Sequence, residues 1–293
     1  MLSLAFWNLG GKNCGDAVIE LGKLFNRSGG QQFSPDVILG FSEPAGVNWR
    51  VIIEKFGEGW SIKHTAQNKF VILSNIGSRI SRTKEISFSF FIEIDTFRGV
   101  PGSSPKKIIV CFTHVPSAFA KYSPSNAKSL AASALRESVS EIEIDWINND
   151  TILIGDLNMD PFDAAMVDCC GLNATMCRQI ALQQTRKCGS MNRKQEIRFF
   201  YNPMWALLGD RTPENQPGSM YHSGDFTDSL YWHCFDQVLL RPTLIPFLAD
   251  RNPKILTRIG SLELLTRKGV IDRARFSDHL PVAVSLTPPG DTK

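Results

Sequence analysis

No stretch of the sequence approaches the roughly 20 consecutive apolar residues that a membrane-spanning helix needs, so we predict no membrane span. Internal repeats and low-complexity tracts are also missing, and no Pro/Gly-rich linker divides the chain. Residues 2–7 already have the composition of a first core strand and no charged leader precedes them, so we expect no secretion signal and a cytoplasmic location. With 43% hydrophobic and 21% charged residues, the 293-residue chain is predicted to be one globular domain spanning residues 1–293.

Cysteine pairs spaced for a zinc ribbon or for dithiol redox chemistry are absent, because no Cys-x-x-Cys occurs. The seven cysteines are an odd number, and four of them gather late in the chain, at Cys169, Cys170, Cys177 and Cys188. These four could in principle hold a metal, but their spacing fits no common template. We therefore predict reduced, partly buried thiols.

The net charge of +3 is unevenly distributed. Residues 251–275 carry seven basic residues against two acidic ones, and residues 178–198 carry six against Glu196 alone. Positive segments beside an acidic remainder suit a protein that gathers carboxylates around a metal and binds a polyanion elsewhere, although each run could equally be a solvated loop or helix face. The candidate nucleic-acid contacts are the basic residues of the first run, Arg178, Arg186, Lys187, Arg193, Lys194 and Arg198.

Short runs with strand composition recur along the chain, and several of them are almost wholly apolar. Apolar strands of this kind lie inside a sheet that is covered on both faces. The predicted strands are residues 2–7, 36–41, 70–73, 86–94, 107–113, 151–154, 235–240 and 282–286. Helices are predicted over 16–25, 125–148 and 163–168, and the longest of them has apolar residues at three- and four-residue steps.

Polar residues stand repeatedly at the ends of these strands, which is a common way to build a site on one rim of a sheet. The acidic members are Glu43, Asp156, Asp236 and Asp278, and the others are Asn8, His114, Asn158 and His279. Carboxylates with amides, and no cysteine among them, suit magnesium or manganese better than zinc. Amides and histidines beside such a cation suit a phosphate ester, whose growing charge they can stabilise.

Six sequence blocks make this pattern recognisable. They are Phe6-Trp-Asn8, Phe41-Ser-Glu43, Thr113-His114, Gly155-Asp-Leu-Asn158, Phe235-Asp236 and Ser277-Asp-His-Leu-Pro281. Together and in this order, they resemble the endonuclease/exonuclease/phosphatase superfamily, which includes pancreatic-type deoxyribonuclease and exonuclease III-type enzymes. The resemblance runs from residue 6 to residue 281 and implies a four-layered α/β sandwich, in which two packed mixed β-sheets are flanked by helices.

The resemblance also implies a metal site and two phosphate-binding amides. Glu43 would be the principal magnesium ligand, helped by Asp278, and manganese would substitute for magnesium. Asn8 and Asn158 would hold the scissile phosphate and stabilise its transition state. Asp156 would orient or deprotonate the attacking water.

Two histidines complete the implied site. His279 would hydrogen-bond a phosphate oxygen or transfer a proton, with Asp236 orienting its ring. His114 resembles the histidine of the pancreatic-type branch, which pairs it with a glutamate on an earlier strand. The comparable strand here, residues 67–73, supplies no acid, which favours His114 as a phosphate contact.

The sequence therefore predicts a magnesium-dependent phosphodiesterase, most simply a nuclease that acts on DNA or RNA. A phosphatase or phosphodiesterase acting on a small or lipid phosphate ester, of the inositol phosphate or sphingomyelin type, stays open because such substrates also attract Lys and Arg. A third alternative is a binding module that keeps the fold without the chemistry. Protein partners are not indicated.

Overall fold

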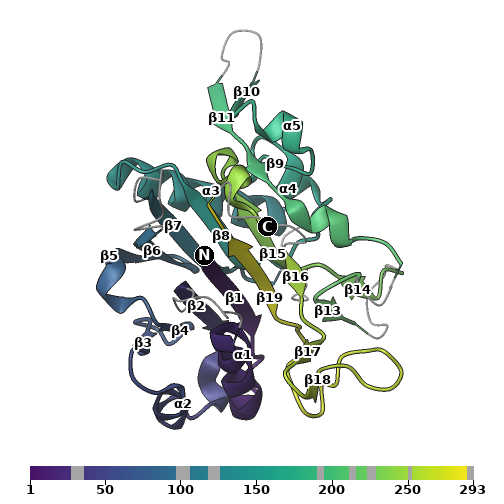
Figure 1. The fold of residues 1–293 in the computed structure, drawn as a ribbon. Helices are drawn as coiled ribbons and strands as arrows, with labels where there is room; N and C mark the ends of the chain where they lie inside the picture. The colour runs from purple at the N-terminus through teal and green to yellow at the C-terminus, as the bar shows by residue number, and fades with distance from the viewer. Residues whose placement is uncertain are drawn as a thin grey trace.

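The computed structural model describes residues 1–27, 36–96, 106–117, 126–189, 195–210, 216–222, 229–249 and 253–288. Within these ranges two mixed β-sheets, of six and seven strands, pack face to face and carry helices on their outer sides (Figure 1). The predicted four-layered α/β sandwich is confirmed.

The six-stranded sheet is centred on the fully buried strand β1, which runs parallel to β2 and antiparallel to β19. Its other neighbouring pairs are antiparallel. In spatial order its strands are β16 (Lys254–Ile255), β19 (Val282–Leu286), β1 (Leu2–Asn8), β2 (Asp36–Ser42), β4 (Phe70–Ser74) and β3 (Ser61–His64).

The seven-stranded sheet contains the parallel pair β7 and β8, and β15 pairs antiparallel with β8. The strand predicted over 86–94 is wrong as a single element, because a turn at Ser87 and Phe88 separates β5 from β6. Ser87 has a left-handed φ of 53°, and the apolar composition runs on through the turn at Phe88. The spatial order is β5 (Ile80–Ile86), β6 (Ser89–Thr96), β7 (Lys106–His114), β8 (Thr151–Asp156), β15 (Asp236–Leu240), β12 (Phe200–Tyr201) and β9 (Ala174–Thr175).

Alternation along the buried strands builds three apolar cores. In β1, Leu4 and Phe6 point into the core between the two sheets, whereas Ala5 and Trp7 point to the core under α1 (Gly15–Arg27) and α2 (Trp49–Phe56). The side chains of successive strand residues face opposite sides, so a wholly apolar strand serves two layers at once. The outer face of the seven-stranded sheet is covered in the same way by α3 (Ala127–Asp145).

Shorter elements connect these layers. The α4 helix (Ala164–Val167) lies within the helix predicted over 163–168, and α5 (Arg178–Ala181) follows it. Among the described residues no helix is both long and apolar enough to cross a membrane. The short 3-10 helices are η1 (Pro44–Gly46), η2 (Gly77–Arg79), η3 (Pro203–Leu207) and η4 (Pro242–Phe247). Three two-stranded ribbons are formed by β10 (Thr185–Cys188) with β11 (Gln195–Arg198), β13 (Met220–Tyr221) with β14 (Trp232–His233), and β17 (Arg258–Ile259) with β18 (Leu262–Glu263).

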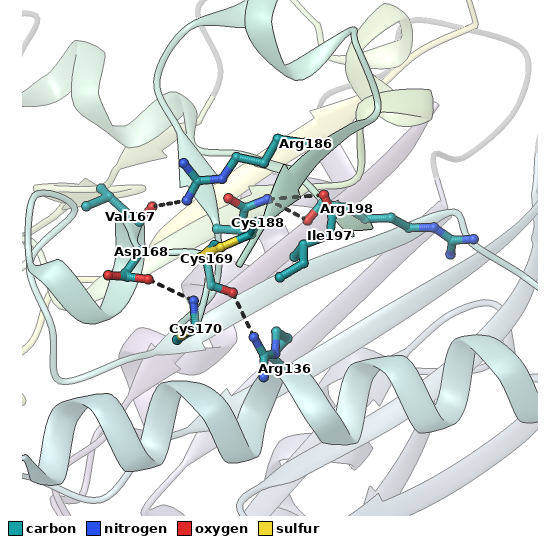
Figure 2. Close-up of a disulfide and its surroundings, with 10 residues drawn as sticks. Arg136, Val167, Asp168, Cys169, Cys170, Arg186, Cys188, Ile197 and Arg198 are labelled. Atoms are coloured by element: carbon teal, nitrogen blue, oxygen red, sulfur yellow. Dashed lines mark hydrogen bonds between the residues drawn. A yellow bond between two sulfur atoms is a disulfide. The ribbon is translucent and has the colours of Figure 1, made fainter. Parts of the chain in front are cut away.

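A disulfide joins Cys169, just after α4, to Cys188, the last residue of β10 (Figure 2). The prediction that the four clustered cysteines are reduced is therefore wrong for this pair, because the ribbon fold brings together two residues whose sequence spacing carries no pairing signal. Disulfides are rare in cytosolic proteins, and the cytoplasmic location stays a prediction. Cys170 and Cys177 are free thiols, as predicted for this cluster, but both are exposed and not partly buried; Cys14, Cys111 and Cys234 are free and buried.

Removing this disulfide is expected to destabilise the protein without unfolding it. The bond joins residues that are 19 positions apart, and closing a loop of that length restricts the unfolded chain by about 3 kcal/mol. Under oxidising conditions Cys188→Ser should lower the free energy of unfolding in urea by about that amount. Cys177→Ser, which removes an exposed free thiol, is the matched control. Equal stability of the two variants would contradict a closed disulfide.

Candidate active site

Polar side chains from both sheets meet at one end of the sandwich. Asn8 is the last residue of β1, and Glu43 directly follows β2, the strand parallel to it. In the other sheet His114 ends β7 and Asp156 ends the parallel strand β8, and the two are register partners. Asp236 begins the antiparallel strand β15 directly opposite Asp156. Parallel strands end at the same edge, so strand direction brings these residues together.

Hydrogen bonds across the two sheets fix the arrangement. Asn8 Nδ2 donates to Asp156 Oδ2 at 3.0 Å and so connects β1 with β8. The segment before β19 is held against β1 by two further bonds. Ser277 Oγ donates to the Asn8 carbonyl at 2.6 Å, and Trp7 Nε1 donates to the His279 carbonyl at 2.8 Å. The predicted residues of both sheets therefore form one network.

Asp156 is the centre of this network and is almost completely buried. Its Oδ1 accepts the backbone N–H of Asn158 at 2.9 Å, and its Oδ2 lies 3.6 Å from His114 Nε2 and 3.9 Å from His279 Nε2. Burial raises the pKa of Asp156, and the carboxylate of Asp236 acts in the same direction, while the two histidines oppose the rise. A carboxylate whose pKa is raised is a better proton acceptor than an exposed one.

His279 and Asp236 form a buried hydrogen-bonded pair. His279 Nδ1 lies 2.7 Å from Asp236 Oδ2, and the Asp236 backbone N–H donates to Ser219 Oγ at 2.9 Å. Burial by itself lowers the pKa of His279, but Asp236, Asp156 and Asp278 outweigh it and raise the pKa to about 10. The imidazole is therefore protonated at neutral pH, with Nδ1–H directed to Asp236 and Nε2–H left for a partner in the cleft.

The predicted catalytic and metal-binding residues, except the buried Asp236, line one cleft of about 410 Å³. Three of its carboxylates, Glu43, Asp156 and Asp278, lie beside the amides of Asn8 and Asn158, and none of the described lining residues is a cysteine. Oxygen donors of this kind fit a hard divalent cation such as magnesium. Glu43 Oε1 also lies 3.6 Å from His114 Nε2, so His114 does meet carboxylates, although neither comes from the earlier strand.

Two sets of acids at this end of the sheets could hold a cation, Glu43 with Asp278 in the cleft and the more buried Asp156 with Asp236. The ligand atoms of Asp156, Asp236 and His279 also lie within 4.8 Å of one another. The hydrogen bond between His279 and Asp236 occupies two of those atoms, whereas the Glu43 side chain is half exposed. Glu43 also has a left-handed φ of 48°, a conformation that costs energy for a residue with a side chain and is found at many functional sites.

Replacing Glu43 should raise the magnesium requirement. Glu43→Gln keeps the length of the side chain but removes one of the negative charges, so the metal concentration for half-maximal activity is expected to rise roughly 10- to 100-fold. The measurement is a magnesium titration of hydrolysis. Glu54→Gln, on the exposed surface of α2, is the matched control. An unchanged magnesium dependence in Glu43→Gln would remove Glu43 from the metal site.

The four predicted nucleic-acid contacts that the structure describes do not line this cleft. Arg198 contacts Asn149, which precedes β8, whereas Asp156 ends that strand. Arg178 stacks on Tyr201, whose register partner Leu240 is the last residue of β15, whereas the active-site residue is the first. Arg186 and Lys187 lie on β10, in the ribbon that projects from the opposite end of the sheets (Figure 1, top). Arg193 and Lys194 lie outside the described residues.

Several residues of the cleft were not predicted. Lys12, Ser117, Met220 and Arg273 line it together with the predicted residues. Two signals could have indicated the cations, since Lys12 follows Asn8 by four positions and Arg273 belongs to the basic run at 251–275. The number of residues between a basic side chain and a motif does not show whether that side chain reaches the cleft.

No protein-family model matches the chain, and no curated protein matches its sequence. Solved structures match over almost its whole length. TDP2 from D. rerio, complexed with a single-strand DNA product, has a TM-score of 0.52 at 18% identity and covers 97% of this chain and 98% of its own. The 3′ phosphatase NExo from Neisseria, bound to a product DNA hairpin, has a TM-score of 0.52 at 14% identity, and the match covers 98% of this chain and 99% of NExo. An AP endonuclease from Archaeoglobus fulgidus has a TM-score of 0.51 at 13% identity, and the match covers 98% of this chain and 99% of the endonuclease. The chain therefore has the endonuclease/exonuclease/phosphatase fold.

Proposed function

We propose that this protein is a divalent-metal-dependent phosphodiesterase that hydrolyses phosphodiester bonds of nucleic acid. One observation carries the proposal: Asn8, from one sheet, donates a hydrogen bond to Asp156 of the other, and the hydrogen-bonded His279–Asp236 pair lies beside it, with His279 Nε2 3.9 Å from Asp156 Oδ2. A general base, two amides and a charged imidazole then face one cleft that is rich in carboxylates.

In this proposal each polar residue of the network has one role in the reaction. Asp156 accepts a proton from water as the water oxygen attacks phosphorus in line with the leaving group; the P–O bond to the leaving group breaks, and the leaving oxygen takes a proton from solvent. Asn8 and Asn158 each use one Nδ2–H within the protein, to Asp156 and to the Val115 carbonyl, and keep the second for a phosphoryl oxygen. The Nε2–H of protonated His279 donates to a non-bridging oxygen, which gains charge in the transition state.

Further charge on the phosphoryl oxygens would be neutralised by a magnesium ion bound by Glu43 and Asp278. The nearby acids keep His279 protonated, and its bond to Asp236 orients Nε2 toward the cleft. His114, between Glu43 and Asp156, contacts a phosphate oxygen in this proposal. Two of the proteins with this fold are bound to DNA products, which supports a nucleic acid as the substrate.

The test is cleavage of labelled single- and double-stranded DNA and RNA in magnesium, manganese or EDTA, beside Asp156→Ala. Metal-dependent cutting that EDTA abolishes and the variant lacks is the expected result, and the preferred polymer names the kind of nuclease. Folded protein that cuts no polymer but hydrolyses a small phosphate ester would overturn the nuclease proposal in favour of an esterase. No hydrolysis of either kind would indicate a binding module.

A further inference from the structure

Two cationic side chains, Lys12 and Arg273, line the candidate cleft. In the part of the chain that the structure describes, neither forms an ion pair with a carboxylate, although the cleft itself contains three. Several buried or half-buried cations elsewhere do have acidic partners, such as Arg241 with Glu143 at 2.7 Å, whereas Arg273 is half-buried and Lys12 is exposed at the rim. A cation that is left unpaired beside a reactive centre is suited to hold an anionic ligand.

Arg273 is fixed between two elements of the site. Its Nη2 donates to the backbone carbonyl of Tyr221 in β13, and the preceding residue, Met220, bridges to His279 and also lines the cleft. Arg273 Nε is buried without a partner among the described residues, and Nη1 makes no hydrogen bond to them. One contact therefore anchors the guanidinium while the two Nη1–H donors and the second Nη2–H stay available, and donors on both Nη atoms can bind a phosphate in a fork geometry.

These cations lie outside the network that serves the scissile phosphate. Asn8, Asn158 and His279 already supply donors to that group, and the carboxylates supply a cation site beside it. Lys12 and Arg273 come from loops next to the network, the first after Asn8 and the second before Asp278.

We infer that Arg273, with Lys12, forms a subsite for the phosphate that neighbours the scissile phosphate on a nucleic-acid strand. The inference rests on the function proposed above and deepens it, because only a substrate with at least two phosphates uses this subsite. It also places strand contact beside the cleft, and not on the β10–β11 ribbon at the far end.

The test uses a trinucleotide of the polymer preferred in the cleavage assay, with two phosphodiesters. Two analogues each keep one phosphodiester and have an uncharged methylphosphonate in place of the other. In the first analogue the methylphosphonate is on the 5′ side of the remaining phosphodiester, and in the second it is on the 3′ side. Wild-type protein should lose about 10- to 100-fold in kcat/KM on one analogue, because a charge-assisted contact is lost. Arg273→Gln should show a similar loss on the unmodified trinucleotide and little further loss on that analogue. Its loss on bis(p-nitrophenyl) phosphate, which has one phosphate, should be much smaller.

Binding gives a readout that does not depend on hydrolysis. Fluorescence anisotropy of a labelled oligonucleotide in EDTA should show weaker binding by Arg273→Gln, with the slope of log K against log salt reduced by about 1. Arg267→Gln is the matched control, because Arg267 is exposed, belongs to the same basic run and is not among the lining residues of the cleft. This control should behave like wild type in both experiments.

The outcomes separate the subsite from the function on which it rests. Equal effects of Arg273→Gln and Arg267→Gln, or equal losses of wild type and Arg273→Gln on the analogues, would overturn the subsite while leaving hydrolysis in place. Oligonucleotide binding that depends on Arg273, in protein that hydrolyses no ester, would support the subsite and overturn the proposed function.

Discussion

Asp156→Asn is expected to lower the turnover number about 100- to 10,000-fold, the contribution of a positioned general base. The change keeps the size of the side chain but removes the negative charge and one acceptor. Asp156 accepts hydrogen bonds at both oxygens, from Asn8 Nδ2 and from the Asn158 backbone, and an amide can accept at only one of them. The variant therefore loses the proton acceptor and loosens the two amides that hold the phosphate.

The measurement is single-turnover hydrolysis of the preferred substrate, with circular dichroism to show that the fold survives. Asp145→Asn is the control, because this half-exposed acid lies at the end of α3 and contacts only Lys84 among the described residues. Turnover near the wild-type value in Asp156→Asn would remove Asp156 from the reaction. A similar loss in both variants would point to a general effect of charge.

Asp236→Asn is expected to lower turnover by about two to four orders of magnitude and also to change its pH dependence. The Asp236 carboxylate is the strongest of the charges that raise the pKa of His279 to about 10. His279 donates from Nε2 while protonated, so activity should fall as the pH rises through its pKa. In the wild type this loss is expected near pH 10, and in Asp236→Asn it should move to clearly lower pH.

A second buried pair provides the control for this experiment. His233 Nδ1 lies 2.8 Å from Asp160 Oδ2, a geometry close to that of His279 with Asp236, but neither residue lines the cleft. Asp160→Asn should reduce stability and leave the alkaline limb of the pH profile in place. If the limb is at the same pH in wild type and Asp236→Asn, His279 is not the group that titrates.

The central strands and their polar ends could be predicted from the sequence for a physical reason. A strand such as β8 is covered on both faces, so its apolar run is continuous and stops where Asp156 begins the site. The turn between β5 and β6 could not be predicted, because it contains Phe88 and depends on a left-handed Ser87. Local composition carries no signal for such a turn.

Long-range features were also beyond the sequence. The bond between Cys169 and Cys188 depends on how the β10–β11 ribbon folds back, and Arg198 faces the start of β8 because of the direction in which β11 runs. A run of basic residues shows that positive charge is available and leaves open at which end of a sheet it lies. The basic run at 251–275 contains Arg273, but that this side chain lines the cleft and contacts Tyr221 is seen only in the structure.

The bond between Asn8 and Asp156 has a consequence for the stability of the whole protein. It crosses the interface between the two sheets, so a ligand that contacts both residues would stabilise the packing of one sheet on the other. Binding energy at such a position is added to the free energy that keeps the layers from separating. Opening motions that part the sheets would, in turn, take the active site apart before either sheet unravels.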